Sequence, residues 1–385
     1  MQHNDITQQL VEYRRYIHKN PELSFQEEGT AEYIKYILKT EGVRVETFGT
    51  HHSFAAIVEG KEKGKTYGLR AELDALPITE KSGLEFSSVN PQAMHACGHD
   101  LHMAIAIGVT LTLHRLRETL KGRFVAIFQS GEEMLPGGAK SIAESKLYRE
   151  LQPDAMFGVH VLPELEVGKV GVCPGKYMAS GDEVYITVKG KGGHAALPHL
   201  LIDPVVCASE IILGLQTLVS RKAPPLIPTV LSFGKVEAIG ATNVIPDEVS
   251  IAGTFRTMDE AWRHEAHKLI REMAMGIAAS HRAGCEVEIR EGYPSIYNNP
   301  ELTQAVKNKA TELFGPENVV ALEPRMTTDD FAYFSNLTPS VYFRVGTGYP
   351  NIENSQLHRP DFNPSEEAIG VAYGLLTKVL QSLLS

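Results

Sequence analysis

A thiol, two imidazoles and a carboxylate lie within six residues of one another in the segment MHACGHDLH, residues 94–102. Cys97, His99, Asp100 and His102 supply them. Such side chains suit Zn²⁺, and imidazole with carboxylate also accepts Mn²⁺, Co²⁺ or Fe²⁺. Taken alone, the segment fits a buried thiol beside surface histidines equally well, because Cys-x-His lacks the paired-cysteine spacing of a structural zinc site. Other parts of the chain must therefore decide.

Three further segments carry acidic or histidine residues at the ends of apolar runs or after a polar loop. Glu132 and Glu133 end FQSGEE, His160 ends FGVH, and His358 follows a loop rich in Gly, Pro and Asn. Ligands of α/β sheets bind at the ends of the strands, so polar residues there are more often functional than structural. These residues favour the metal-site interpretation of residues 94–102.

Length and composition set the class of protein. With 385 residues and 43% hydrophobic residues, the chain exceeds the usual size of a single core, so we expect two domains. A net charge of −10 argues against a nucleic-acid surface and offers no basic stripe to anionic lipid. We expect small-molecule partners, no nucleic acid and no membrane.

The start of the chain and its cysteines bear on location. The first residues show no basic segment followed by an apolar one, and no apolar run is long enough to span a bilayer. Cys97, Cys173, Cys207 and Cys285 form no Cys-x-x-Cys pair, which favours a reducing compartment. We therefore expect a cytoplasmic protein, in which all but Cys97 are ordinary core cysteines.

Most of the chain reads as an α/β protein. Apolar runs predict strands, amphipathic repeats predict helices, and their alternation predicts a sheet with ligands at its strand ends. In the first half, strands are expected at 54–58, 67–73, 124–128 and 155–159, with helices at the start, at 30–39 and after Leu101. Near the C-terminus, a helix after Pro300, a strand at 341–345 and a closing helix through 369–383 are expected.

The pattern changes at Gly181. An alternating strand at 183–189, a helix capped by Asp203, two strands, a helix after Asp259 and a last strand give the order β-α-β-β-α-β of a ferredoxin-like unit. We therefore predict that residues 181–291 form an inserted ferredoxin-like α+β domain. Residues 1–180 and 292–385 would then form a discontinuous catalytic α/β/α domain with a mixed sheet, because His358 must return to the site.

Eight motifs occur in order along the chain: RAELDALPI, MHACGHDLHMA, FQSGEE, GVH, GKGGHAALPH, TNVIPDEVSIAGTFRT, TDDFAYF and LHRPDF. Each is weak alone. Together they resemble the metallopeptidase M20 family, specifically its amidohydrolase branch. That branch includes hippurate hydrolase-like, N-acetyl-diaminopimelate deacetylase-like and auxin-conjugate hydrolase-like enzymes. The resemblance extends from the first helix to the last.

The resemblance implies a hydrolase with two divalent metal ions per subunit. Mn²⁺ or Zn²⁺ is expected, with Co²⁺, Ni²⁺ or Fe²⁺ as further options. The implied ligands are Cys97, His99, Glu133, His160 and His358. Cys97 is the expected bridging ligand, because a metal-bound thiol is deprotonated and a thiolate can serve two cations. Two such ions can activate a water and stabilise a tetrahedral intermediate.

Two carboxylates gain roles from the same resemblance. Glu132 would be the general base that takes a proton from water and passes it to the leaving amine. Asp74 would orient a ligand such as His99 through a hydrogen bond. The alternative for Glu132 is a solvated Glu-Glu pair. Asp100 and His102 are not expected to be metal ligands.

Three residues of the inserted domain are also implied. His194 would reach the active site of a partner subunit and stabilise the oxyanion. Asn243 and Arg256 would contact the carboxylate or carbonyl of the substrate, a role that suits the guanidinium fork. The alternatives are a loop histidine after a glycine turn and a solvated arginine on an alternating strand. The insertion is expected to form a homodimer through its helices or a sheet edge.

The chain departs from the family pattern at two places. Glu72 stands where the family has aspartate, and Met134-Leu135-Pro136-Gly137-Gly138 replaces a run of glycines. Neither departure is at a ligand position. Substrate preference stays open, since Met134 and Leu135 could line the pocket.

We expect a metal-dependent amidohydrolase that cleaves the amide of an N-acyl amino acid or a small amino-acid conjugate. Three alternatives stay open. The same site could serve a dipeptidase or carboxypeptidase, Cys97 could be a nucleophile with a histidine base, or the protein could bind metal without turnover. No motif specifies the acyl group, the amino acid or the metal.

Overall fold

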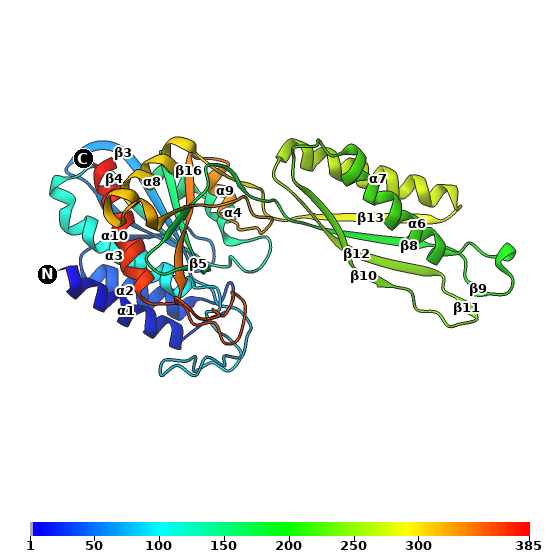
Figure 1. The fold of residues 1–385 in the computed structure, drawn as a ribbon, viewed down its shortest axis with the longest axis horizontal. Helices are drawn as coiled ribbons and strands as arrows, with labels where there is room; N and C mark the ends of the chain where they lie inside the picture. The colour runs from blue at the N-terminus through cyan, green and yellow to red at the C-terminus, as the bar shows by residue number, and fades with distance from the viewer. Residues whose placement is uncertain (1–2) are drawn as a thin grey trace. The chain divides into compact units, whose positions relative to one another are not determined.

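The computed structural model describes residues 3–385 and divides the chain into two compact units (Figure 1). Unit 1 contains the chain up to Gly175, Tyr297–Pro324 and Asp330–Ser385. Unit 2 contains Lys176–Ile296 and Arg325–Asp329. Short strands β7 (Gly175–Met178) and β14 (Ile296–Asn298) lie where the chain leaves and re-enters unit 1.

The insertion is therefore wider than the predicted 181–291 and takes in a second segment. Main-chain hydrogen bonds are the reason: Ala179 N donates to the carbonyl oxygens of Arg325 and Thr327, and Ser180 N donates to Thr257 O at 2.7 Å. Because such bonds need no particular side chain, the sequence carries no sign of them.

Unit 1 is built on an eight-stranded sheet with the order β1-β2-β4-β3-β5-β16-β6-β15. Its central strands run parallel and are β3 (Glu62–Glu72), β4 (Lys121–Gln129), β5 (Ala155–Glu166) and β16 (Ser340–Gly348). The outer strands are β1 (Arg44–Thr47), β2 (Phe54–Glu59), β6 (Val170–Val172) and β15 (Val319–Ala321). Antiparallel pairs β1–β2, β2–β4 and β6–β16 make the sheet mixed.

Helices cover both faces of this sheet (Figure 1). One face carries α1 (His3–Lys19), α2 (Glu28–Thr40), α3 (His99–Leu116), α8 (Pro300–Phe314) and α10 (Glu367–Leu383). The other carries the shorter α4 (Gly138–Ala143), α5 (Lys146–Leu151) and α9 (Ala332–Ser335). Alternation along β5 sends Phe157, Val159 and Val161 into the main core and His160 to the opposite face. The predicted α/β/α class is confirmed.

Unit 2 has an antiparallel sheet with the order β10-β12-β8-β13, which is the order expected of a ferredoxin-like unit. The strands are β8 (Asp182–Lys189), β10 (Thr229–Glu237), β12 (Glu248–Thr257) and β13 (Gly284–Glu291). Helices α6 (Pro204–Thr217) and α7 (Glu260–Ser280) cover one face. As predicted, Asp203 caps α6, accepting from the main-chain N–H groups of Val205 and Val206.

Candidate metal centre and active site

The C-terminal ends of the parallel strands in unit 1 gather the predicted site residues. His99 is the first residue of α3 and Cys97 lies two residues before it, Glu132 and Glu133 follow β4, and His160 lies within β5. His358 comes from the loop after β16 and joins them. Ligand-type atoms lie within 4.8 Å of one another in two groups that share a residue: Cys97 with His99 and His160, and Cys97 with Glu133 and His358.

The Cys97 thiol belongs to both of these groups. Cys97 Sγ lies 3.4 Å from Nε2 of His160, and Glu133 Oε1 lies 3.3 Å from Nε2 of His358. His160 Nδ1 donates to the main-chain oxygen of Val161 at 2.8 Å, which leaves its Nε2 facing the thiol. Two neighbouring cation positions with one common sulfur ligand are therefore compatible with the side chains as they lie.

His99 is fixed from behind. Its Nδ1 donates to the main-chain oxygen of Asp74 at 2.9 Å and lies 3.3 Å from the Asp74 carboxylate. Its Nε2 is buried, has no hydrogen-bond partner in the described part of the chain, and lies 4.0 Å from Glu132 Oε2. A buried imidazole nitrogen without a partner, facing a carboxylate, fits the role of a metal ligand. The Asp74 carboxylate also accepts from Glu133 N at 2.9 Å.

His102 uses both ring nitrogens elsewhere. Its Nδ1 donates to Glu72 Oε2 at 2.9 Å, and its Nε2 accepts from Val161 N at 3.1 Å. The imidazole therefore ties β3 to β5 and offers no nitrogen to a metal ion. Glu72 also pairs with Arg70, which reaches Asp330 beside α9. The Glu72 carboxylate thus lies close to the ligand residues. Its proximity was not predicted, because Glu72 does not occupy a ligand position in the sequence motif.

Negative charge is in excess at this centre. Burial lowers the pKa of His99, but Glu72, Asp74 and Glu133 outweigh burial and raise it to about 10. Burial raises the pKa of the Cys97 thiol, and Glu133 and Glu132 raise it further. Bound cations would offset this charge and favour the thiolate. The donor set of thiol, imidazole and carboxylate therefore fits divalent transition-metal ions.

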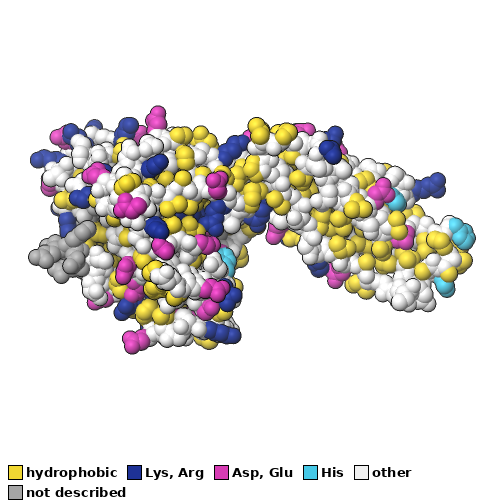
Figure 2. Space-filling view, viewed as in Figure 1, with side chains coloured by type: hydrophobic (Ala, Val, Ile, Leu, Met, Phe, Trp, Pro, Cys, Tyr) yellow, Lys and Arg dark blue, Asp and Glu magenta, His cyan; other side chains and the backbone are white. Residues whose placement is uncertain are grey.

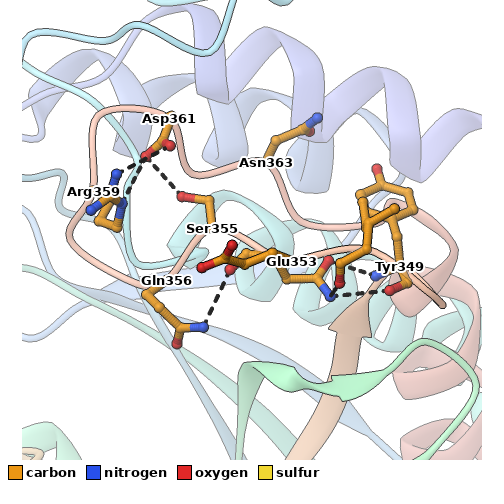
Figure 3. Close-up of a pocket in the computed structure, with 9 residues that line it drawn as sticks. Tyr349, Glu353, Ser355, Gln356, Arg359, Asp361 and Asn363 are labelled. Carbon is orange, nitrogen blue, oxygen red and sulfur yellow. Dashed lines mark hydrogen bonds and ion pairs between the residues drawn. The ribbon is translucent and has the colours of Figure 1, made fainter.

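The loop that carries His358 is held by main-chain hydrogen bonds at His358 and at Pro360. His358 has a positive φ of 61° and donates its main-chain N–H to Ala96 O at 2.8 Å. Lys81 N donates to Pro360 O at 2.7 Å. The same loop lines a polar cavity of about 560 Å³, in which Ser355 and Arg359 both bond Asp361 (Figure 3). Contacts with two other loops therefore keep His358 in a backbone conformation that side chains rarely adopt.

Unit 2 brings together two of its three predicted site residues. His194 in β9 (Gly193–His194) is exposed and pairs with Val244 of β11 (Val244–Ile245), next to Asn243. Asn243 accepts from Ala195 N through its main-chain oxygen at 3.1 Å. Glu248, at the start of β12, pairs with Lys189, which lies five residues before His194. Arg256 lies at the other end of β12, where its side chain donates to Met326 O at 3.0 Å. Within one unit, Arg256 therefore does not join the other two.

Two buried side chains near the site were not predicted. Ser24 Oγ donates to Asp74 Oδ2 at 2.7 Å, and Glu27 accepts from Gly131 N at 2.8 Å. Both belong to a loop before α2, and no spacing or residue type in that loop distinguishes them in one sequence. Met134 and Leu135, expected near the pocket, are 48% and 42% exposed beside Glu133.

Comparison with known proteins shows the family to which the chain belongs. Residues 68–382 match the sequence model of peptidase family M20/M25/M40. The chain is 37% identical over 377 residues to an N-acetyldiaminopimelate deacetylase of Listeria monocytogenes, covering 97% of this chain and 99% of that one. It is 35% identical over 379 residues to an N-acetyl-L-cysteine deacetylase of Bacillus subtilis, covering 98% and 89%.

A solved structure gives the same assignment. The YXEP protein of Bacillus subtilis, described as a dinuclear metal binding peptidase from the M20 family, superposes with a TM-score of 0.86 at 33% identity and covers 99% of both chains. The chain therefore belongs to the M20 family, within its amidohydrolase branch, and the predicted resemblance is confirmed. Among the described residues, no helix is long and apolar enough to cross a membrane.

Proposed function

We propose that this protein is a dinuclear metal-dependent amidohydrolase that cleaves the amide bond of N-acyl amino acids or small amino-acid conjugates. One observation carries the proposal. Cys97 belongs to two adjacent groups of ligand-type atoms, one with His99 and His160 and one with Glu133 and His358. When bound, the two ions, Mn²⁺ or Zn²⁺ in the first instance, would polarise the scissile carbonyl and lower the pKa of water.

The chain's own residues supply the proton transfer. Glu132 is buried next to Glu133, with its Oε2 4.0 Å from His99 Nε2. In this position its carboxylate accepts a proton from the attacking water and donates it to the nitrogen of the leaving amine. The products are a carboxylic acid and a free amino acid, and Glu132 returns to its ionised form.

The nucleophilic alternative is disfavoured by the surroundings of Cys97. Burial and the carboxylates of Glu133 and Glu132 raise the pKa of its thiol. A nucleophilic cysteine needs the opposite environment, one that favours thiolate at neutral pH without a metal ion. The substrate class is supported by the two deacetylases named above, both of which act on N-acetyl amino acids according to their names.

Unit 2 is proposed to form a homodimer and to act on the site of the partner. Figure 2 shows hydrophobic side chains gathered on the surface of this unit. Several are strongly exposed, namely Val206 and Leu213 on α6, Met275 on α7, and Leu226, Val236 and Ile239 nearby in the sequence. An exposed apolar surface of this kind is typical of a surface that binds another protein. In the dimer, His194 would complete the second subunit's active site, as the family resemblance implies, and Asn243, which lies beside His194, would contact the substrate there.

The proposed function is tested with N-acetyl, N-benzoyl and dipeptide substrates, each with Mn²⁺, Zn²⁺ or EDTA. We expect metal-dependent release of free amino acid from the N-acyl substrates, and a fall in kcat of about 10²–10⁴-fold in Glu132→Gln, the usual contribution of a general base. Preference for dipeptides would point to a peptidase instead. EDTA-resistant turnover, or an equally active Glu132→Gln variant, would contradict the proposal.

A further inference from the structure

Glu27 is a buried carboxyl that the proposed chemistry does not use. It precedes α2, and its residue is 0% exposed. Its Oε1 accepts two main-chain hydrogen bonds, from Phe25 N at 2.8 Å and from Gly131 N at 2.8 Å. Its Oε2 is buried without a hydrogen-bond partner among residues 3–385. One oxygen therefore joins two segments that are 104 residues apart.

The second of these segments is the turn that carries Glu132 and Glu133. Gly131 adopts a φ of +66°, and a Cβ atom on it would lie 2.3 Å from the Phe25 ring. On the other side of Glu132, the main-chain N–H of Glu133 donates to the Asp74 carboxylate. The backbone of Glu132 is therefore held on both sides by an N–H bond to a buried carboxyl group.

Stability alone is a poor reason for a buried carboxyl here. Removing a carboxyl from water opposes folding unless a cation or several hydrogen bonds compensate. The hydrogen bonds that the described structure gives to the Glu27 side chain both come from the main chain of the two loops. The neighbouring Glu28 is exposed at the same helix N-terminus, where it can interact with the helix dipole without burial.

We infer that Glu27 is a positioning residue for Glu132: by holding the Gly131 amide and the Phe25 loop, it fixes the turn from which Glu132 reaches the reacting water. The inference rests on the proposed function. Burial, with a smaller contribution from Asp74, raises the pKa of Glu27 to about 7. A carboxyl that is partly protonated at neutral pH still accepts both N–H bonds through its carbonyl oxygen, as a glutamine amide does.

Three variants separate this role from a merely structural one. Glu27→Ala removes the acceptor, Glu27→Gln keeps it, and Glu28→Gln changes a neighbouring exposed carboxylate as the matched control. In Glu27→Ala we expect kcat to fall by roughly 10–100-fold, as small misplacements of catalytic groups do, with KM and metal content unchanged. Glu27→Gln should keep most of the activity, and Glu28→Gln should match the wild type.

Hydrogen–deuterium exchange supplies a readout that needs no turnover. The peptide covering residues 129–135 should exchange faster in Glu27→Ala than in the wild type, and at the wild-type rate in Glu27→Gln. If Glu27→Ala does not fold, Glu27→Asp, whose shorter side chain withdraws the acceptor, takes its place. Unchanged exchange at 129–135 would overturn the inference, as would a kcat loss of equal size in Glu27→Gln. Wild-type inactivity on all substrates would count only against the proposed function.

Discussion

Cys97 shows how a single side chain links the electrostatics of the site to its proposed chemistry. Buried among carboxylates, its thiol has a raised pKa, while the same carboxylates raise the pKa of His99 to about 10. Without a bound metal ion, the Cys97 thiol and the His99 imidazole therefore both stay protonated at neutral pH. Metal binding must displace these protons, so metal affinity should increase with pH.

Replacement of Cys97 by serine tests the shared-ligand role. A serine hydroxyl does not ionise near neutral pH and cannot serve two cations as a thiolate does. In Cys97→Ser we expect the affinity for the second Zn²⁺ to fall by more than about tenfold, the lower end of what loss of an outer-shell partner costs a metal site. Isothermal titration of the metal-free protein would measure it.

Cys173 provides the matched control for this substitution. It is also buried in unit 1, its Sγ lies 3.9 Å from the Pro174 carbonyl oxygen, and it belongs to neither of the two groups of ligand-type residues that share Cys97. Cys173→Ser should bind both ions with wild-type affinity. Equal losses in the two variants would show that Cys97→Ser acts through folding and not through ligation.

At the scale of elements, several site residues lie in loops at the strand ends, and Glu80 organises a loop that contacts one of them. Its side chain is 4% exposed, and it contacts His18 of α1 at 3.2 Å and accepts from Ser88 N at 2.6 Å. The loop then continues to Lys81, whose N–H bonds Pro360 two residues after His358. A surface loop is thereby coupled to the main helical layer and to the segment that carries a proposed ligand.

The pH dependence of stability should reveal this coupling. Burial raises the pKa of Glu80, but bonds from His18, Ser82 and Ser88 outweigh burial and lower it from 4.5 to about 2. A lowered pKa in the folded state gives stability that is complete above about pH 4.5 and is lost as the pH falls toward 2. Wild type should therefore exceed Glu80→Gln in unfolding free energy at pH 7, with the difference shrinking in acid.

Urea unfolding at several pH values between 7 and 3 would measure this difference. Glu85→Gln is the control, because Glu85 lies in the same loop and is exposed. At every pH, the urea concentration at which half of the Glu85→Gln protein is unfolded should equal that of the wild type. A difference between wild type and Glu80→Gln that grows toward low pH would contradict the assigned role of Glu80.

The sequence predicted the elements better than the contacts between them. Alternating and helical periodicities, with caps such as Asp203, were enough to predict the strands and helices of the α/β sheet and the ferredoxin-like order, because these patterns are local. Glu27 was missed because its partner Gly131 is 104 residues away and offers only a main-chain N–H. The grouping of Arg325–Asp329 with unit 2 was not predicted for the same reason, since main-chain hydrogen bonds join this segment to Ala179.

At the scale of the whole molecule, the placement of His194 raises the question of which active site it serves. His194 and Asn243 lie side by side and exposed on unit 2, whereas Arg256 lies at the opposite end of β12. If all three residues contact substrate, they need not contact the substrate molecule in the same active site. If His194 of one chain acts on the partner's site in a symmetric dimer, the partner's His194 must act on the first chain's site, because a two-fold axis makes every such exchange reciprocal.

Subunit complementation decides between the two arrangements. Glu132→Gln and His194→Ala, carried on differently tagged chains, are co-expressed and the doubly tagged heterodimer is purified. If His194 acts on the partner's site, the His194→Ala chain contributes its own Glu132 and receives His194 from the other chain. One site is then intact, and about half of the wild-type activity should return because the two sites of a symmetric dimer are equivalent. If His194 acts within its own chain, both sites lack one group and the heterodimer should be as inactive as the two parent homodimers.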